Sequence, residues 1–129
     1  MNDSAILVVD DDPSAVEIVQ TYLEARGYRV ATASDGREAL AKLEEVRPAL
    51  VLLDVMMPGM DGWEVARIIK NHPELGGKVR VVMLTALGGF ADKQEGLRAG
   101  ADDYIVKPIR LEELGKTVER NLAARRHAA

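Results

Sequence analysis

The residues of this sequence best suited to chemistry each follow a short apolar run: Asp10, Asp11, Asp54, Thr85 and Lys107. Crowded carboxylates repel one another, and a hard cation with oxygen ligands, above all Mg²⁺, relieves that repulsion. A carboxylate can attack a phosphoryl group to form an aspartyl phosphate, and a lysine ammonium and a threonine hydroxyl can stabilise its transition state. The set therefore predicts Mg²⁺-assisted phosphoryl transfer to Asp54.

The elements that must position these residues are short strands separated by helices. Apolar runs predict strands buried on both faces at residues 5–9, 49–54 and 79–84, and shorter strands at 28–33 and 103–106. Amphipathic periodicity predicts a helix after each strand. These helices begin at Pro13 and near Asp35 and Asp61, and two more span about Phe90–Ala99 and Leu111–Leu122.

This alternation of strand and helix predicts an α/β fold with a parallel sheet and helices on both faces. The predicted architecture is a flavodoxin-like (βα)5 doubly wound sheet with strand order 2-1-3-4-5. In that order the strands that end at Asp10, Asp54, Thr85 and Lys107 are neighbours, and ligands bind at such carboxyl ends. Each residue alone is more often a cap, a turn former or a solvated charge. The functional prediction therefore depends on their joint placement.

Other polar and aromatic residues are predicted to have structural roles. Helix-capping positions are assigned to Asp12, Asp35 and Asp61. Packing within loops is assigned to Trp63, Met56, Met57 and Met60. Exposure without a partner or a function is assigned to His72 and His127.

Length and composition indicate a single globular domain over residues 1–129, with a core of about 5–123 and a short basic tail at 124–129. The sequence has no apolar run of the roughly 20 residues that span a bilayer. Its start does not resemble a secretory signal. The absence of cysteine fits a cytoplasmic protein. The net charge of -4 gives no reason to expect direct binding to nucleic acid or to a membrane.

Several segments together resemble the receiver domain of bacterial two-component response regulators, and the resemblance runs from Ile6 to about Leu122. The segments that carry it are ILVVDDDP at 6–13, LLDVMMPGMDG at 52–62, LTA at 84–86 and GADDYIVKP at 100–108. A response regulator receives its phosphoryl group from a phosphohistidine of a sensor kinase or of a histidine phosphotransfer protein. The resemblance therefore implies a phosphoacceptor signalling domain that assists its own phosphorylation and dephosphorylation, rather than an enzyme.

The resemblance also implies a role for individual residues. Asp54 matches the phosphoacceptor and also a metal ligand. Asp11 matches a direct Mg²⁺ ligand, and Asp10 matches an acidic neighbour that acts through water. Mn²⁺ is an alternative ion. The resemblance further implies that the backbone carbonyl of Met56 binds the metal. It also implies that Thr85, the Ala86 backbone N–H and Lys107 bind the phosphoryl group. The bond between Lys107 and Pro108 is expected to be cis, and Thr85 and Tyr104 match the switch residues.

Phosphorylation in this family remodels the face formed here by the helix of about 90–99, the strand 103–106 and the final helix. That face would bind a downstream protein, an output domain or a second receiver, so both a monomer and a homodimer through this face remain open. No output domain follows within the sequence, which fits either a stand-alone regulator or a receiver from a longer protein. The apolar residues Met56 and Leu87 beside the site predict slow loss of the phosphoryl group, and Gly88-Gly89 predicts an unusually free loop.

Other classes of protein agree less well with these residues. A small phosphohydrolase with an aspartate nucleophile commonly has a second Asp where this chain has Met56. A nucleotide-binding domain needs a glycine-rich turn after the first strand, where this chain has acidic residues and Pro13. The alternative that we retain is a receiver-like interaction scaffold that works without phosphorylation, although such a scaffold is expected to lack Asp54, Lys107 or the acidic pair.

Overall fold

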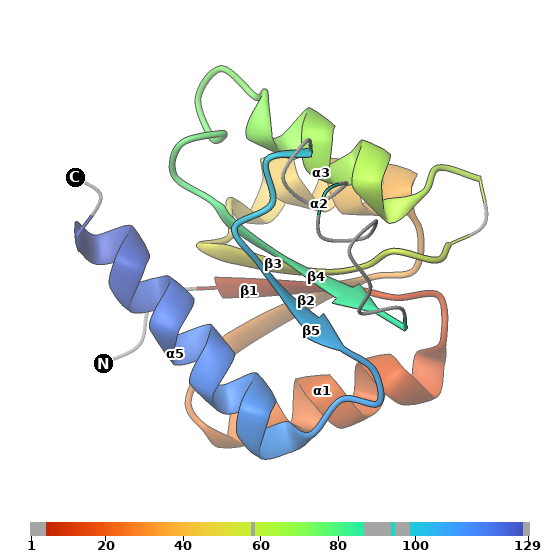
Figure 1. Ribbon diagram of the computed structural model, residues 1–129, viewed down its shortest axis with the longest axis vertical. Helices are drawn as coiled ribbons and strands as arrows, with labels where there is room; N and C mark the ends of the chain where they lie inside the picture. Colours follow the sequence, from red (N-terminus) through yellow and green to blue (C-terminus); the bar gives the residue numbers. More distant parts are fainter. Residues whose placement is uncertain (1–4, 58, 87–93, 95–98, 128–129) are drawn as a thin grey trace.

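The computed structural model describes residues 5–57, 59–86, 94 and 99–127 of the chain, and it contains a parallel five-stranded sheet (Figure 1). The strands are β1 (Ala5–Val9), β2 (Arg29–Ala33), β3 (Leu50–Asp54), β4 (Arg80–Thr85) and β5 (Asp103–Val106). Their order is β2-β1-β3-β4-β5, and every neighbouring pair is parallel. This is the predicted flavodoxin-like order.

Helices cover both faces of this sheet. Their bounds are α1 (Pro13–Ala25), α2 (Gly36–Val46), α3 (Gly62–Lys70) and α5 (Leu111–His127). Helices α1 and α5 lie on one face and α2 and α3 on the other (Figure 1), so the core has two layers. The strands β1 and β3 are buried along their whole length, as two covered faces require.

Local sequence determines where three of the helices begin. Asp12 precedes Pro13, a residue suited to a first helical turn. Its side chain accepts a hydrogen bond from the backbone N–H of Ser14. Asp35 and Asp61 each accept one from the N–H three residues later, at 2.8 and 2.9 Å. The three predicted caps are therefore confirmed, and they fix the first turns of α1, α2 and α3.

Several sequence-based predictions fall outside the described residues. The helix expected at about Phe90–Ala99 lies there apart from Gln94 and Ala99, as do Leu87 and the pair Gly88-Gly89. At the other end, α5 continues to His127, so the predicted tail begins inside a helix. Of the helices within the described part of the chain, none is long and apolar enough to cross a membrane.

His72 is not exposed without a partner, and this prediction was wrong. Its Nδ1 accepts the backbone N–H groups of Glu74 and Leu75, both at 3.1 Å. Its Nε2 therefore carries the proton and donates to Glu44, with 2.6 Å between Nε2 and Oε1. Glu44 belongs to α2, far away in sequence, so no local pattern could indicate this partner.

Met56 also departs from the expected packing within the loop, because its side chain is 71% exposed. Met57 is buried and Met60 packs against the core layer of α2 and α3, as predicted. Trp63 packs against the same layer, but from within α3 and not from a loop.

Asp103 links β5 to α5 and gives stability a dependence on pH. Burial alone would raise the pKa of Asp103, but hydrogen bonds from Arg120, Asn121 and the Tyr104 amide outweigh it and lower that pKa below its ordinary 3.8. The unfolded chain then binds more protons in the acid range. The contribution of Asp103 to the free energy of unfolding is complete above about pH 4, and it is lost as the pH falls through the lowered pKa.

We therefore expect Asp103→Asn to lower the free energy of unfolding at pH 7 by about 1 kcal/mol, since Arg120 is itself largely exposed. The loss should be smaller at about pH 3 than at pH 7, because the contribution of Asp103 falls away below about pH 4. Urea unfolding at both pH values measures this, with the exposed Glu45→Gln as the control. An equal loss at both pH values would contradict the assignment.

Candidate functional site

Asp54 is the last residue of β3, and its side chain is buried at the carboxyl edge of the sheet. Only 3% of the residue is exposed. In the register, Asp54 lies opposite Leu84 of β4, one residue before Thr85, and the end of β1 is the neighbour on the other side. One oxygen of the carboxylate, Oδ1, accepts the backbone N–H of Met56 at 3.3 Å. The turn after β3 therefore orients this carboxylate.

Asp10, Asp11 and Asp54 form one acidic group, in which one carboxylate oxygen from each lies within 4.8 Å of the others. Asp10 is almost fully buried, and its Oδ1 accepts the N–H of Asp12 at 3.0 Å. Burial raises the pKa of Asp10, and repulsion from Asp54 raises it further, against the opposing effects of the Asp12 N–H and Lys107. The negative charge of these three carboxylates is therefore only partly compensated by nearby positive groups.

Lys107 supplies positive charge from the loop after β5. Its Nζ lies 3.2 Å from Oδ1 of Asp54 and 3.5 Å from Oδ2 of Asp10. Burial alone would lower the pKa of Lys107, but the attraction of Asp10 and the hydrogen bond to Asp54 raise it, so the ammonium stays charged. The backbone N–H of Lys107 donates to the Thr85 carbonyl at 2.7 Å, and the bond to Pro108 is cis, as expected.

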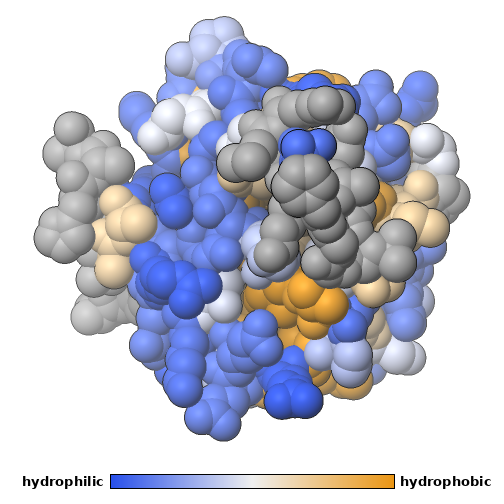
Figure 2. Space-filling view, in the orientation of Figure 1, coloured by the Kyte–Doolittle hydropathy of each residue, from blue (hydrophilic) through white to orange (hydrophobic). Residues whose placement is uncertain are grey.

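The remaining predicted residues lie at the end of β4, directly after it and on β5. Thr85 ends β4 and is buried, and exposed Ala86 follows it. Tyr104 belongs to β5, lies opposite Met83 of β4 and is 39% exposed. Figure 2 shows apolar surface over β5. The roles of Thr85, Ala86, Tyr104 and the Met56 carbonyl remain predictions.

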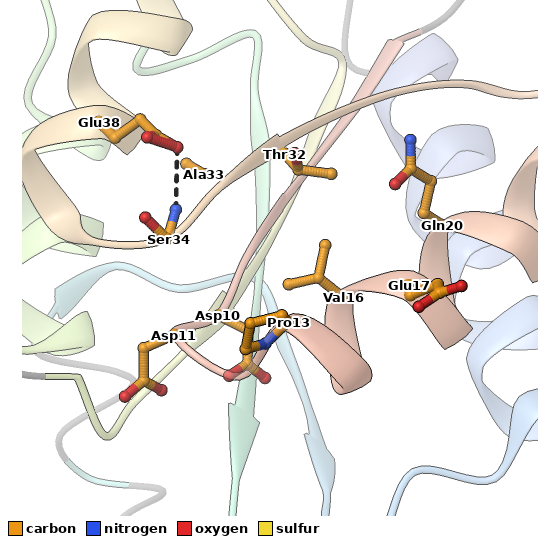
Figure 3. Close-up of a pocket in the computed structure, with 10 residues that line it drawn as sticks. All are labelled: Asp10, Asp11, Pro13, Val16, Glu17, Gln20, Thr32, Ala33, Ser34 and Glu38. Carbon is orange, nitrogen blue, oxygen red and sulfur yellow. Dashed lines mark hydrogen bonds between the residues drawn. The ribbon is translucent and has the colours of Figure 1, made fainter.

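A cavity of about 240 Å³ opens beside the acidic group, between α1 and the end of β2 (Figure 3). Asp10 and Asp11 line it together with Val16, Glu17 and Thr32. On its far wall, Glu38 accepts the N–H of Ser34 at 3.1 Å, as the dashed line in Figure 3 shows. Asp11 is thus accessible to solvent while Asp10 and Asp54 are buried.

These residues fit a hard divalent cation. The donors are carboxylate oxygens only, within the described part of the chain, and two of the three are buried. Mg²⁺ prefers such oxygen donors, keeps several waters and commonly takes one or two carboxylates together with phosphate oxygens. The exposed Asp11 leaves a side open for water and for a phosphoryl group. Asp10, Asp11 and Asp54 are therefore the residues that would hold the ion.

A parallel doubly wound sheet with a buried aspartate, two neighbouring aspartates and a lysine at its carboxyl edge is the arrangement of one class of signalling domain. Residues 6–119 match the sequence model of the response regulator receiver domain. The chain belongs to this family of two-component signalling proteins.

Individual relatives agree with this assignment. A probable transcriptional regulator, ycf27, of Cyanophora paradoxa is 46% identical over 114 residues, which cover 88% of this chain and 46% of that protein. The DNA-binding response regulator MtrA of Mycolicibacterium smegmatis is 44% identical over 117 residues, covering 91% of this chain and 50% of MtrA. The chain thus spans about half the length of these relatives.

Solved structures show the same fold. Chemotaxis protein CheY4 of Vibrio cholerae superimposes with a TM-score of 0.87 at 38% identity, covering 92% of this chain and 98% of CheY4. A CheY-like receiver domain protein from Methanospirillum hungatei gives a TM-score of 0.89 at 31% identity, covering 99% of this chain and all of the other.

Sequence reasoning missed one residue that contacts the site. Gly62 begins α3 and lies directly against the backbone of Asp54. The available signal was a glycine at the first helical position after a capping Asp61, where alanine is the better helix former.

Proposed function

We propose that this receiver accepts a phosphoryl group on Asp54 from a phosphohistidine of a sensor kinase or of a histidine phosphotransfer protein. The observation that carries the proposal is the position of Lys107, whose ammonium contacts both Asp54 and Asp10 at the carboxyl edge of the sheet. A lysine so placed can neutralise charge on a phosphoryl group attached to Asp54.

In the proposed reaction, a carboxylate oxygen of Asp54 attacks phosphorus while the bond from phosphorus to the donor histidine nitrogen breaks. The nitrogen keeps the electron pair of that bond, which leaves a neutral imidazole once the proton balance with solvent is restored. The acceptor needs no general base, because a carboxylate is already ionised at neutral pH. The products are an aspartyl phosphate and the dephosphorylated donor.

The residues of this chain each contribute to that transfer. Asp10, Asp11 and Asp54 would hold Mg²⁺, which when bound neutralises charge on phosphate oxygens. Lys107 neutralises another part of this charge, and the Met56 amide keeps the acceptor carboxylate oriented. Thr85, at the end of the neighbouring strand, would bind a phosphoryl oxygen through its hydroxyl, beside the Ala86 N–H.

The proposed output is a shift between two packings of the chain. A phosphoryl group that Thr85 contacts in only one packing favours that packing. Tyr104, now 39% exposed, would turn inward behind Thr85. The surface next to β5 would thereby change its affinity for a downstream protein or output domain. Relatives named as DNA-binding or transcriptional regulators support an output of this kind.

A cavity of about 270 Å³ next to Lys107 supports docking of the donor close to the acceptor. It lies between α1 and the loop after β5, and its lining includes Ile18, Pro108 and Leu111. Ile18 is 57% exposed and Leu111 37%, so apolar side chains are available to a partner. In the retained alternative, a receiver-like scaffold would bind partners through such surfaces without phosphorylation of Asp54.

The first test is the intact mass of the full chain after incubation with acetyl phosphate and Mg²⁺. We expect one phosphoryl adduct, which disappears when EDTA replaces Mg²⁺ and maps to the peptide that contains Asp54. A folded protein that takes up no phosphoryl group and does not bind beryllofluoride would support the scaffold instead.

The aspartyl phosphate should be lost slowly. Met56 is apolar and stands two residues after the acceptor, and Leu87 has the matching place after Thr85 in the family pattern. Neither side chain carries an acidic or amide group that could position an attacking water. We expect Met56→Glu and Leu87→Glu each to shorten the phosphoryl half-life by about tenfold or more, since positioned acid–base groups contribute at least this much. Phosphate release from phosphorylated protein measures it, with Ile68→Glu on α3 as the control. A wild-type half-life no longer than that of the variants would refute the idea.

A further inference from the structure

Gly62 packs against the backbone of the acceptor residue more closely than a side chain would allow. Gly62 is buried at the first position of α3, and its N–H donates to the Val55 carbonyl at 3.0 Å. A Cβ atom at this position would lie 2.2 Å from the carbonyl oxygen of Asp54 and 2.8 Å from Cα of Val55. Both distances are below the 3.0 Å that real Cβ atoms keep, and both neighbours are backbone atoms.

The requirement concerns space and not backbone conformation. Gly62 follows the helix cap Asp61 and takes part in an ordinary first helical turn, which alanine would adopt more readily. Since the obstructing atoms belong to the Asp54–Val55 peptide, a larger residue could fit only if α3 or this peptide moved. Glycine is therefore needed at this position for the close contact with the Asp54–Val55 peptide and not for helix formation.

The peptide that Gly62 contacts also determines where the acceptor carboxylate lies. Val55 is fixed from two sides, because its N–H donates to Leu84 of β4 at 3.0 Å and its carbonyl accepts from Gly62. The side chain of Asp54 starts at this peptide, and the Met56 amide that contacts its Oδ1 follows directly. A displacement of even about 1 Å would change the 3.2 Å contact between Asp54 and Lys107.

We propose that Gly62 is a positioning residue for phosphoryl transfer: its bare Cα allows the start of α3 to lie on the Asp54 carbonyl and so places the acceptor carboxylate against Asp10, Asp11 and Lys107. This inference rests on the proposed function of Asp54. It adds a residue that touches neither metal nor phosphoryl group and that acts only through the peptide it contacts.

The test compares Gly62→Ala with the control Gly115→Ala. At Gly115, in α5, a Cβ would meet the Tyr22 hydroxyl at 2.5 Å, so this variant introduces a tight contact with a side chain of α1 and with none of the three aspartates of the acidic group. Mg²⁺ affinity is read from the fluorescence of Trp63, the only tryptophan. We expect Gly62→Ala to weaken Mg²⁺ binding by about 10- to 100-fold, as loss of an outer support does in metal sites, and to slow phosphorylation by acetyl phosphate. Gly115→Ala should leave both unchanged, whatever its effect on the unfolding midpoint.

Wild-type Mg²⁺ affinity in Gly62→Ala, or an equal loss in the two variants, would overturn the proposal. If Gly62→Ala does not fold in buffer, trimethylamine N-oxide is added to both variants to favour the folded state. Hydrogen exchange on wild type gives a second readout that needs no variant: Mg²⁺ should slow exchange of the Gly62 amide and not that of Gly115. Equal exchange rates with and without Mg²⁺ would also overturn it. A wild type that binds Mg²⁺ but takes up no phosphoryl group would instead refute the proposed function.

Discussion

Replacing Asp54 with asparagine should abolish phosphorylation while leaving the fold intact. Asparagine has nearly the same shape, and its side-chain oxygen can still accept the Met56 amide that now contacts Oδ1. It has no anionic oxygen to attack phosphorus, so no aspartyl phosphate can form. The substitution also removes a negative charge from a buried, crowded acidic group, and so we expect the variant to be at least as stable as wild type. Intact mass after acetyl phosphate and Mg²⁺, together with the urea midpoint, measures both effects.

Asp61→Asn is the matched control for this result. Asp61 lies in the same loop and is also an aspartate, but it caps α3 at the protein surface. Asparagine caps helices about as well as aspartate, so this variant should fold and should take up the phosphoryl group normally. An adduct on Asp54→Asn, or its loss in Asp61→Asn, would show that the acceptor is a different residue.

Lys107→Met should slow phosphorylation by about 10²- to 10³-fold, the effect of removing one preorganised group that stabilises developing charge. Methionine keeps most of the side-chain length but not the ammonium that lies 3.2 Å from Asp54 and 3.5 Å from Asp10. Mg²⁺ should bind more tightly to this variant, because the internal cation that offsets the three carboxylates is absent. A loss of rate with a gain in Mg²⁺ affinity would separate the role of Lys107 from that of the metal ligands.

The measurements are the rate of adduct formation at saturating Mg²⁺ and the Mg²⁺ dissociation constant from Trp63 fluorescence. Lys116→Met is the control, since Lys116 is exposed on α5 and pairs only with Glu112 among the described residues. It should match wild type in both. If Lys107→Met is phosphorylated at the wild-type rate, the proposed contact between the ammonium and the phosphoryl group is wrong.

The features that the sequence alone determined are those that depend on neighbours along the chain. Asp12, Asp35 and Asp61 cap their helices through hydrogen bonds to residues two or three positions away, so the starts of α1, α2 and α3 were predictable. Uninterrupted apolar runs indicated strands covered on both faces. Their alternation with helices left few arrangements, because parallel crossovers are right-handed, and the flavodoxin-like arrangement predicted among them has the observed strand order.

The same logic predicted where Asp10, Asp54, Thr85 and Lys107 would meet. Parallel strands bring their carboxyl ends to one edge, so residues that end neighbouring strands converge whatever their separation in sequence. The structure places the Lys107 ammonium against Asp54 across 53 positions of sequence, as this argument requires.

Only the tertiary structure decided features that depend on contact with a distant surface. The bond from His72 to Glu44 joins positions 28 residues apart on separate elements, and no periodicity encodes such a pair. Met56 was exposed and Met57 buried for the same reason, since the direction of a loop side chain depends on what lies beside the loop. The place of Gly62 against Asp54 is a further case. A glycine at a helix start has many uses, and its use here follows from the distance between two backbones that only the folded chain brings together.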